Sequence, residues 1–222
     1  MNENLNPLES IQEIKAYMQK SSRFLSLSGW SGIWVGTCGI ISGLLVIYFV
    51  NQSGTYDYTK GRTYRDYTDV SERLLTLKLL ITAITTFIIA ISGGFFFSMR
   101  KAKKEGIPFV NHIFRRMVVN FSIPLITGGF ICLALIKYDM IILMAPCTLI
   151  FYGLSLLVIA RDTLDEVRKL ALFEIVLGIL ALFLLQYSVI FWVIGFGFLH
   201  IIYGIIMKNK YDTKTREIGE RE

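Results

Sequence analysis

The stretch from residue 170 to residue 207 reads LALFEIVLGILALFLLQYSVIFWVIGFGFLHIIYGIIM, and its only charged residue is Glu174. A helix needs about 20 apolar residues to cross a bilayer core of about 30 Å, so this stretch is long enough for two crossings. The polar triplet Gln186-Tyr187-Ser188 divides it near the middle. We therefore interpret it as two membrane-spanning helices, Leu170–Gln186 and Tyr187–Met207, joined by a very tight turn.

Four more apolar runs precede this pair: Phe24–Val50, Leu74–Ser98, Met117–Ile136 and Met140–Ala160. The chain is 54% hydrophobic with a mean hydropathy of +0.55, which is more apolar than soluble domains of this length. The pattern predicts an all-α polytopic membrane protein with six transmembrane helices in one membrane domain, residues 24–207. Because the first run lacks a small-residue cleavage site after a short apolar core, we expect it to be retained.

The loops between these runs alternate in their content of Lys and Arg. Seventeen of the 23 basic residues lie in the N-terminal segment, the 99–116 loop, the 161–169 loop and the C-terminal tail, whereas five lie in the 51–73 loop or at Lys137. The positive-inside rule therefore predicts that both termini are cytoplasmic. The basic segments are expected to contact anionic lipid headgroups at the cytoplasmic face, and no nucleic-acid partner is expected.

Two further segments flank the membrane domain. Residues 1–23 are predicted to form a cytoplasmic amphipathic helix, because Asn6-Pro7-Leu8-Glu9 has the pattern of a capping box and apolar residues follow at helical spacing. The alternative is a simple extension of the first span. Residues 208–222 are predicted to be a cytoplasmic tail.

The loop at 51–73 is the only sizeable segment expected outside the cytoplasm. Its two Tyr/Thr-rich arms around Lys60-Gly61 predict a short hairpin. Such a hairpin could cap a ligand site or serve as a solvated connector with interfacial tyrosines. Near the other face, Thr163-Leu164-Asp165-Glu166 has the pattern of a capping box, which predicts that the fifth spanning helix begins in the cytoplasm.

Glycines recur on one face of the first spanning helix, at intervals of three and four residues. Glycine lets helix backbones approach closely in lipid, so this face is a candidate helix-packing seam against another helix. A ligand in the same groove is the alternative reading. The seam consists of Gly29, Gly32, Gly36, Gly39 and Gly43.

Ionisable residues inside the membrane are the first place to look for function. Lys78 lies early in the second span, where its long side chain can reach the interface. Glu174 has no partner on its own helix, but it lies about as far before the Tyr187-Ser188 turn as His200 lies after it. Counting about 1.5 Å per residue puts both at the same depth. We therefore predict a candidate intramembrane polar site of Glu174, His200 and Tyr203.

Within this site, Glu174 and His200 either face each other or share a polar pocket with Tyr203, Asn120 or Arg161. A carboxylate beside an imidazole can bind or relay protons, because histidine titrates near neutral pH. The competing readings are a satisfied polar pair without function, and a Glu174 side chain that extends to the cytoplasmic interface.

Spans three to six also resemble a repeated hairpin. Gly129, Tyr138 and Tyr152-Gly153 match Gly178, Tyr187 and Tyr203-Gly204 at offsets of about 50 residues. Tight turns, Lys137-Tyr138-Asp139 and Gln186-Tyr187-Ser188, lie in the middle of both hairpins. A duplicated helical pair is a common way to build membrane folds.

The sequence carries no catalytic signature. It lacks a His-Glu-x-x-His helix, a phosphate-binding glycine loop and a Gly-x-Ser-x-Gly elbow. The cysteines Cys38, Cys132 and Cys147 all lie in apolar runs without metal-ligand spacing, so we expect packing residues and no functional disulfide. The chain is accordingly expected not to be an enzyme and to need no metal or other cofactor.

The segments Gly178-Ile-Leu-Ala-Leu-Phe and Gly195-Phe-Gly197 with Tyr203-Gly204 resemble small, uncharacterised six-span bacterial membrane proteins of the acid-resistance, HdeD-like type. The long 51–73 loop departs from that pattern. The resemblance implies a multi-pass protein of the bacterial inner membrane but no activity. The expected role is that of a non-catalytic interaction, regulatory or stress-linked component, which acts through helix packing and cytoplasmic or lipid contacts as a homo-oligomer or with a membrane partner. The alternative function is a small transporter or channel, proton-linked through Glu174 and His200.

Overall fold

The computed structural model describes residues 28–53, 56–57, 62–63, 69–104, 106 and 109–212. Apart from one small hairpin, these residues form helices joined by short turns. The long α-helices among the described residues are α2 (Gly29–Ser53), α3 (Asp69–Lys104), α4 (His112–Lys137), α5 (Met144–Ile159) and α6 (Asp165–Phe183). The predicted N-terminal helix and most of the predicted C-terminal tail lie outside the described residues.

The C-terminal segment, residues 185–212, is built from several helical pieces in continuous succession. They are the 3-10 helix η2 (Leu185–Tyr187), α7 (Ser188–Trp192), the π-helix η3 (Val193–Leu199), α8 (His200–Met207) and the π-helix η4 (Lys208–Asp212). A second 3-10 helix, η1 (Ile141–Leu143), leads into α5. A short 3-10 helix thus follows the first predicted tight turn, and another covers most of the second. Asp139, in the first of these turns, adopts a left-handed backbone conformation with φ of 54°.

Five segments of the described chain are long and apolar enough to cross a membrane: Gly29–Ser53, Arg73–Lys104, His112–Lys137, Ile141–Ile159 and Leu185–Lys210. The prediction of a helical, membrane-type chain is confirmed to this extent. The helix α6 is not among the five, because charged residues fill its first turns and Glu174 lies in its middle. The helix α3 has 36 residues and is about 54 Å long, so it extends beyond the predicted span at both ends.

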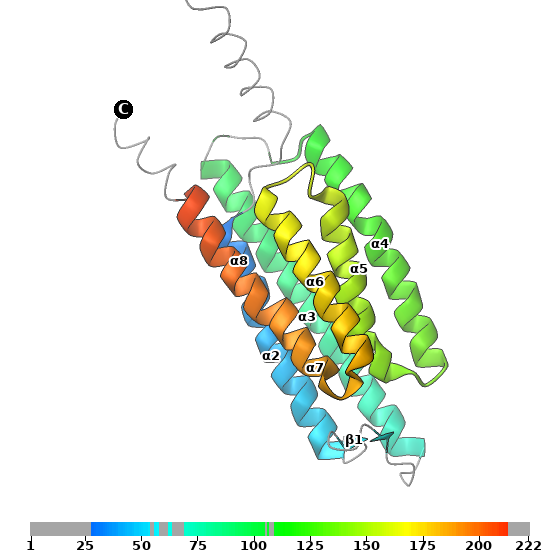
Figure 1. Cartoon of the computed structure of the whole chain (residues 1–222). Helices are drawn as coiled ribbons and strands as arrows, with labels where there is room; N and C mark the ends of the chain where they lie inside the picture. Colours follow the sequence, from blue (N-terminus) through cyan, green and yellow to red (C-terminus); the bar gives the residue numbers. More distant parts are fainter. Residues whose placement is uncertain are drawn as a thin grey trace, which may run out of the picture.

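Neighbouring helices follow the order α3, α2, C-terminal segment, α6, α5 and α4. In Figure 1, α2 and α8 lie at one side of the bundle and α5 and α4 at the other. The main neighbour of α3 is α2, and the main neighbour of α4 is α5. The C-terminal segment contacts both α2 and α6, and it therefore joins the two halves of the bundle. Its residues have neighbours on two sides, which makes it the natural place for a buried site.

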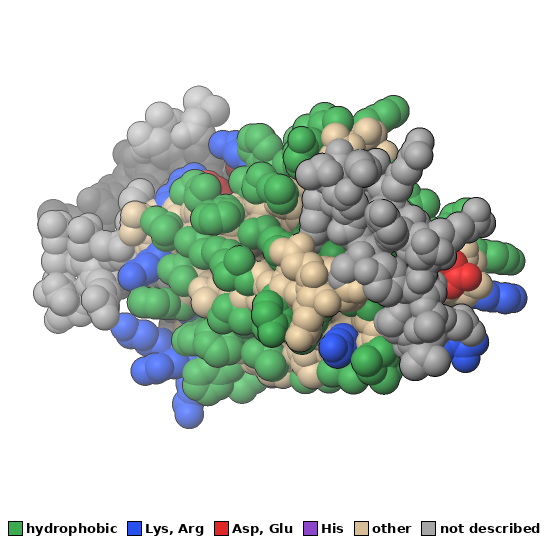
Figure 2. All heavy atoms as spheres, turned by 90° about the horizontal axis from the view of Figure 1, so that it is seen from below, with side chains coloured by type: hydrophobic (Ala, Val, Ile, Leu, Met, Phe, Trp, Pro, Cys, Tyr) green, Lys and Arg blue, Asp and Glu red, His purple; other side chains and the backbone are tan. Residues whose placement is uncertain are grey.

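The outer surface of the bundle is strongly apolar. Hydrophobic side chains cover most of the described surface in Figure 2, and Lys and Arg lie mainly toward its edges. Large side chains such as Phe130 and Phe183 are 68% and 82% exposed. Contiguous apolar surface of this extent is rare on monomeric soluble proteins and is the surface expected in contact with lipid.

The predicted hairpin between the first two spans is present. Strands β1 (Tyr56–Asp57) and β2 (Arg62–Thr63) pair in antiparallel register, with Tyr56 opposite Thr63 and Asp57 opposite Arg62. The connection is shorter than the predicted loop of 51–73, because α2 continues to Ser53 and α3 begins at Asp69. The residues of the hairpin's turn lie outside the described part of the chain.

The predicted capping box at the start of α6 is wrong. The residue that precedes the helix is Leu164, which makes no side-chain cap. The Thr163 hydroxyl donates instead to the Ile159 carbonyl at 3.2 Å, because Thr163 still belongs to the buried turn that follows α5.

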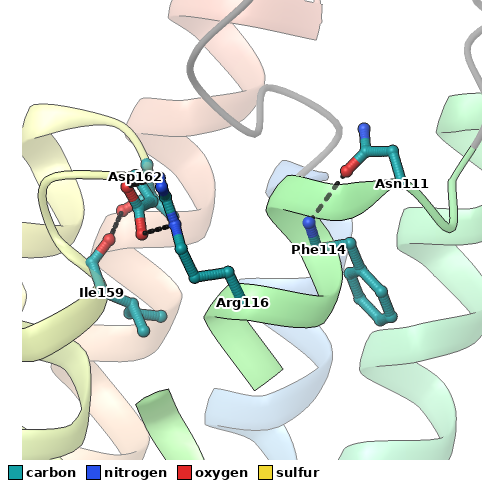
Figure 3. A network of polar contacts seen from close by, with 6 residues as sticks. Asn111, Phe114, Arg116, Ile159 and Asp162 are labelled. Carbon is teal, nitrogen blue, oxygen red and sulfur yellow. Dashed lines mark hydrogen bonds and ion pairs between the residues drawn. The ribbon is translucent and has the colours of Figure 1, made fainter. Parts of the chain in front are cut away.

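Ion pairs and a helix cap fix the helix ends near the turn between α5 and α6. Arg116 reaches from α4 and makes a two-pronged ion pair with Asp162 in the turn between α5 and α6 (Figure 3). Asn111 caps α4, since its side-chain oxygen accepts from the Phe114 amide at 2.8 Å. Lys210 donates to Glu166 at 2.5 Å and so ties the end of the C-terminal segment to α6.

Candidate intramembrane polar site

The structure brings Glu174 and His200 together. Glu174 lies in the middle of α6 and His200 is the first residue of α8, and these two helices run on either side of the turn at Leu185–Tyr187. Nδ1 of His200 lies 3.4 Å from Oε1 of Glu174. The Glu174 side chain is fully buried and His200 is 3% exposed. The alternative in which Glu174 extends to the cytoplasmic interface is therefore wrong.

His200 makes two shorter contacts. Its Nδ1 lies 3.0 Å from the carbonyl oxygen of Gly195, and its Nε2 lies 2.8 Å from the hydroxyl of Tyr152. A backbone carbonyl can only accept, so Nδ1 carries the hydrogen. Nε2 can then accept from the Tyr152 hydroxyl. Both ring nitrogens are thus satisfied by a neutral imidazole, and the remaining approach to Glu174 is the longest of the three.

The Glu174 carboxyl group is the unsatisfied member of the site. Both of its oxygens are buried, and neither has a hydrogen-bond partner among the described residues. An unpaired carboxylate in such a place is strongly disfavoured, because burial removes its water without a replacement. A protonated carboxyl group beside the neutral imidazole leaves the site without net charge. Loss of that proton leaves one buried negative charge, with His200 Nδ1–H as a donor 3.4 Å from Oε1.

Gly195 makes room for the carboxyl group. A Cβ atom at this position would lie 2.5 Å from Oε2 of Glu174 and 2.6 Å from Cδ2 of Leu149. Glu174 therefore occupies a notch that exists because residue 195 has no side chain. Gly195 belongs to the π-helix η3, a rare helix type that often marks functional sites.

Aromatic rings enclose the imidazole. Phe196 stacks on His200 with ring centroids 5.9 Å apart and an interplanar angle of 12°, and it contacts Tyr152 at 4.9 Å. Trp192 lies 4.9 Å from Phe196, and its indole N–H donates to the Thr148 hydroxyl at 3.2 Å. These rings surround the polar pair with apolar surface, which strengthens electrostatic interactions inside the site.

The other residues predicted for this site are placed differently. Tyr203 packs against the buried apolar cluster that includes Leu156 and Leu170, and the hydroxyl in contact with the imidazole is that of Tyr152. Arg161 is exposed and Asn120 is half-buried, whereas Glu174 is fully buried. Lys78 lies with its Nζ 5.5 Å from the Phe49 ring, on another pair of helices.

Sequence reasoning missed Tyr152 and Gly195. The depth count that paired Glu174 with His200 also applies to Tyr152, which follows the Lys137-Tyr138-Asp139 turn by about as many residues as Glu174 precedes the Tyr187-Ser188 turn. That signal was available. The role of Gly195 was not, because it depends on the π-helical register of η3.

No family model, no curated protein and no solved structure matches this chain. The resemblance to acid-resistance-type proteins therefore stays a prediction. Within the described residues, no group of three or more His, Cys, Asp or Glu side chains could hold a metal ion, and the three cysteines are free thiols.

The five glycines of the predicted seam lie against the chain's own C-terminal segment. A Cβ at Gly29 or Gly32 would meet the backbone of Gly204, and one at Gly36 would lie 2.6 Å from the Gly197 carbonyl oxygen. The remaining two, Gly39 and Gly43, abut residues of η3: the Phe196 carbonyl and the Val193 side chain. The partner helix predicted for this seam is therefore part of the same molecule.

Proposed function

We propose that this chain is a non-catalytic, multi-pass membrane protein that works as a small proton-linked transporter, with Glu174 and His200 as its proton-binding pair. The observation that carries the proposal is the Glu174 carboxyl group, which is fully buried, has no hydrogen bond to any described residue and lies 3.4 Å from the imidazole. Ionisable groups at such positions in membrane proteins are costly and commonly mark ion or proton pathways.

The proposed topology has six spans, namely the five long apolar segments and α6. Both termini lie in the cytoplasm of a bacterial cell. The charges of α6 support this, since Asp165, Glu166, Arg168 and Lys169 all lie in its first turns and leave only Glu174 within the apolar part. The clustering of Lys and Arg in alternate loops supports the orientation. The same basic loops are proposed to contact anionic headgroups of the inner membrane.

A proton is the ligand that fits the site best. The pair is enclosed by aromatic rings, and the described residues near it offer no further acidic group to share a metal ion. One proton removes the buried negative charge of Glu174 and requires no additional space. When the proton leaves, the negative charge on Glu174 has the Nδ1–H of His200 as a hydrogen-bond donor 3.4 Å away.

The second candidate is a regulatory or stress-linked component that acts through a homo-oligomer or a membrane partner. The observation in its favour is that α3 and α4 lie at the outside of the bundle and each has one main neighbour. The glycine seam gives this candidate no support, because the C-terminal segment of the same chain already fills it.

Charge movement on a solid-supported membrane tests the proposal without knowledge of the transported substrate. Proteoliposomes of the full chain are given a rapid pH jump, and the transient current is recorded. We expect a current for the wild type and for Glu166→Gln, whose carboxylate pairs with Lys210 at the helix end, and none for Glu174→Gln. Equal currents for wild type and Glu174→Gln, or no current for any of them, would contradict the proposal.

A further inference from the structure

The π-helix η3 touches two parts of the molecule at once. It comprises the seven residues Val193–Leu199 and lies in the middle of the C-terminal spanning segment. One side of it faces the polar pair, and another side faces the glycine seam of α2. A change in this one segment would therefore be felt at both places.

On the side of the polar pair, three contacts depend on the register of η3. The Gly195 carbonyl accepts from His200 Nδ1, the Gly195 Cα lies against the Glu174 carboxyl group, and Phe196 stacks on the imidazole. A π-helix accommodates more residues per turn than an α-helix. Conversion of η3 to an α-helix would rotate the residues after η3 relative to those before it. The rotation is about 100° for each residue by which the register shifts. The three contacts could not all survive that rotation.

On the side of α2, η3 fits without spare space. The backbone of Gly39 faces the Phe196 carbonyl, Gly43 faces the Val193 side chain, and a Cβ at Gly36 would lie 2.6 Å from the Gly197 carbonyl oxygen. Packed interfaces of this kind change between discrete arrangements rather than by gradual deformation. The same rotation of η3 would thus require α2 to repack.

The proton on Glu174 decides where the Nδ1–H of His200 points. With the carboxyl group protonated, the Nδ1–H stays on the Gly195 carbonyl, as observed at 3.0 Å. When the proton leaves, the carboxylate at 3.4 Å competes for the same N–H, and a charged acceptor makes the stronger hydrogen bond. The Gly195 carbonyl is then released and can accept from the Leu199 amide, which is the hydrogen bond of an α-helix.

We propose that η3 is a two-state element that couples the proton occupancy of the Glu174–His200 pair to the packing of α2 against the C-terminal segment. This inference rests on the proposed proton-binding function. The titratable group that contacts the pair from the packed elements is Tyr152 of α5, whereas Tyr203 of α8 packs against the adjoining apolar cluster, and α7 and η3 contain no titratable group. α4 contributes the apolar ring of Phe121, which contacts Tyr152.

The three tryptophans report on this coupling separately. Trp192 directly precedes η3, and Trp30 lies at the far end of the seam with Lys208 Nζ 4.1 Å from its ring. Trp34 belongs to α2, but its side chain points to α3, where it donates to the Ile89 carbonyl. The full chain is labelled with 5-fluorotryptophan in lipid nanodiscs, and its ¹⁹F spectra are recorded from pH about 4 to about 9. We expect the Trp192 and Trp30 signals to shift with pH and Trp34 to stay constant. In Glu174→Gln, all three should be constant.

A reciprocal test uses a glycine of the seam that does not itself contact Glu174 or His200. Coupling between two sites acts equally in both directions, so disturbing the seam must change proton binding at Glu174. Gly39→Ala introduces a methyl group against the Phe196 carbonyl, whereas Gly129→Ala on α4 meets nothing within 4 Å. Infrared titration of the Glu174 carboxyl band should show a midpoint moved by about half a pH unit or more in Gly39→Ala only.

These outcomes separate the two proposals. The switch is overturned if the Glu174 band titrates but the Trp192 signal of the wild type stays constant. It is also overturned if both glycine variants keep the wild-type midpoint. Either result leaves proton binding intact. Absence of a titrating Glu174 band overturns the proton-binding function itself. If Gly39→Ala does not fold, the wild-type and Glu174→Gln fluorine spectra still decide the matter.

Discussion

Glu174 occupies the space that a side chain at Gly195 would need, since a Cβ there would lie 2.5 Å from Oε2 of the carboxyl group. Two residues from different helices thus form one packing unit around a buried acid. A methyl group added at residue 195 must push the carboxyl group, Leu149 or the helix itself aside. The consequences of this fit are open to measurement.

Gly195→Ala should destabilise the protein by about 1–3 kcal/mol, the usual cost of an extra methyl group in a tightly packed site. Thermal unfolding in detergent measures this, with Gly129→Ala as the control because that position is open. In Glu174→Ala, where the carboxyl group is gone, the added cost of Gly195→Ala should fall by more than about 0.5 kcal/mol. Strict additivity of the two substitutions would show that they do not share this space.

Tyr152→Phe should change the environment of the His200 ring, because it removes the hydroxyl that lies 2.8 Å from Nε2. The ¹⁵N resonance of Nε2 in selectively labelled protein reports this hydrogen bond directly. Tyr203→Phe is the matched control, and it should leave the resonance nearly unchanged. A larger effect from Tyr203→Phe would mean that the sequence-based choice of tyrosine was the right one.

Gly32→Leu should separate α2 from α8, because a Cβ at residue 32 already lies 2.8 Å from the Cα of Gly204. We expect a loss of about 1–3 kcal/mol or more of stability, since overpacking forces backbone shifts. Gly129→Leu carries the same side chain at a position with nothing within 4 Å and should change little. Equal thermal stability of the two variants would exclude the proposed role of the glycine seam in packing.

Asp162→Asn should have a much smaller effect than either glycine substitution. The Arg116 side chain of this ion pair is 48% exposed, and exposed pairs typically contribute below about 1 kcal/mol. The shift in unfolding temperature should also shrink as salt is added, because salt screens exposed charges. A large effect that does not depend on salt would show that Asp162 has another structural task.

The arrangement of helices follows from features visible in the sequence. The apolar runs set the positions of the helices, and the triplet Gln186-Tyr187-Ser188 sets the turn between the last two. Counting residues from that turn was enough to bring Glu174 and His200 to the same depth, because the rise of a helix per residue is nearly constant.

What could not be predicted depends on rotation about the helix axes. Tyr152 and Tyr203 occupy equivalent places in the predicted repeat, and only the rotation of their helices decides which ring reaches the imidazole. The π-helical register of η3 could not be predicted, because its apolar residues carry no pattern that distinguishes a π-helix from an α-helix. The predicted cap at Thr163 is wrong because the Thr163 hydroxyl donates to the Ile159 carbonyl of the preceding turn and does not cap α6.

Infrared difference spectroscopy of the membrane-reconstituted chain tests the proton-binding pair most directly. Spectra recorded between pH about 4 and about 9 should contain the C=O stretching band of one protonated, buried carboxyl group that disappears as the pH is raised. The band should persist in Glu166→Gln and be absent from Glu174→Gln. A band that survives in Glu174→Gln, or a wild-type spectrum without any such titrating band, would contradict the assignment of Glu174 and His200 as the site where this protein binds its proton.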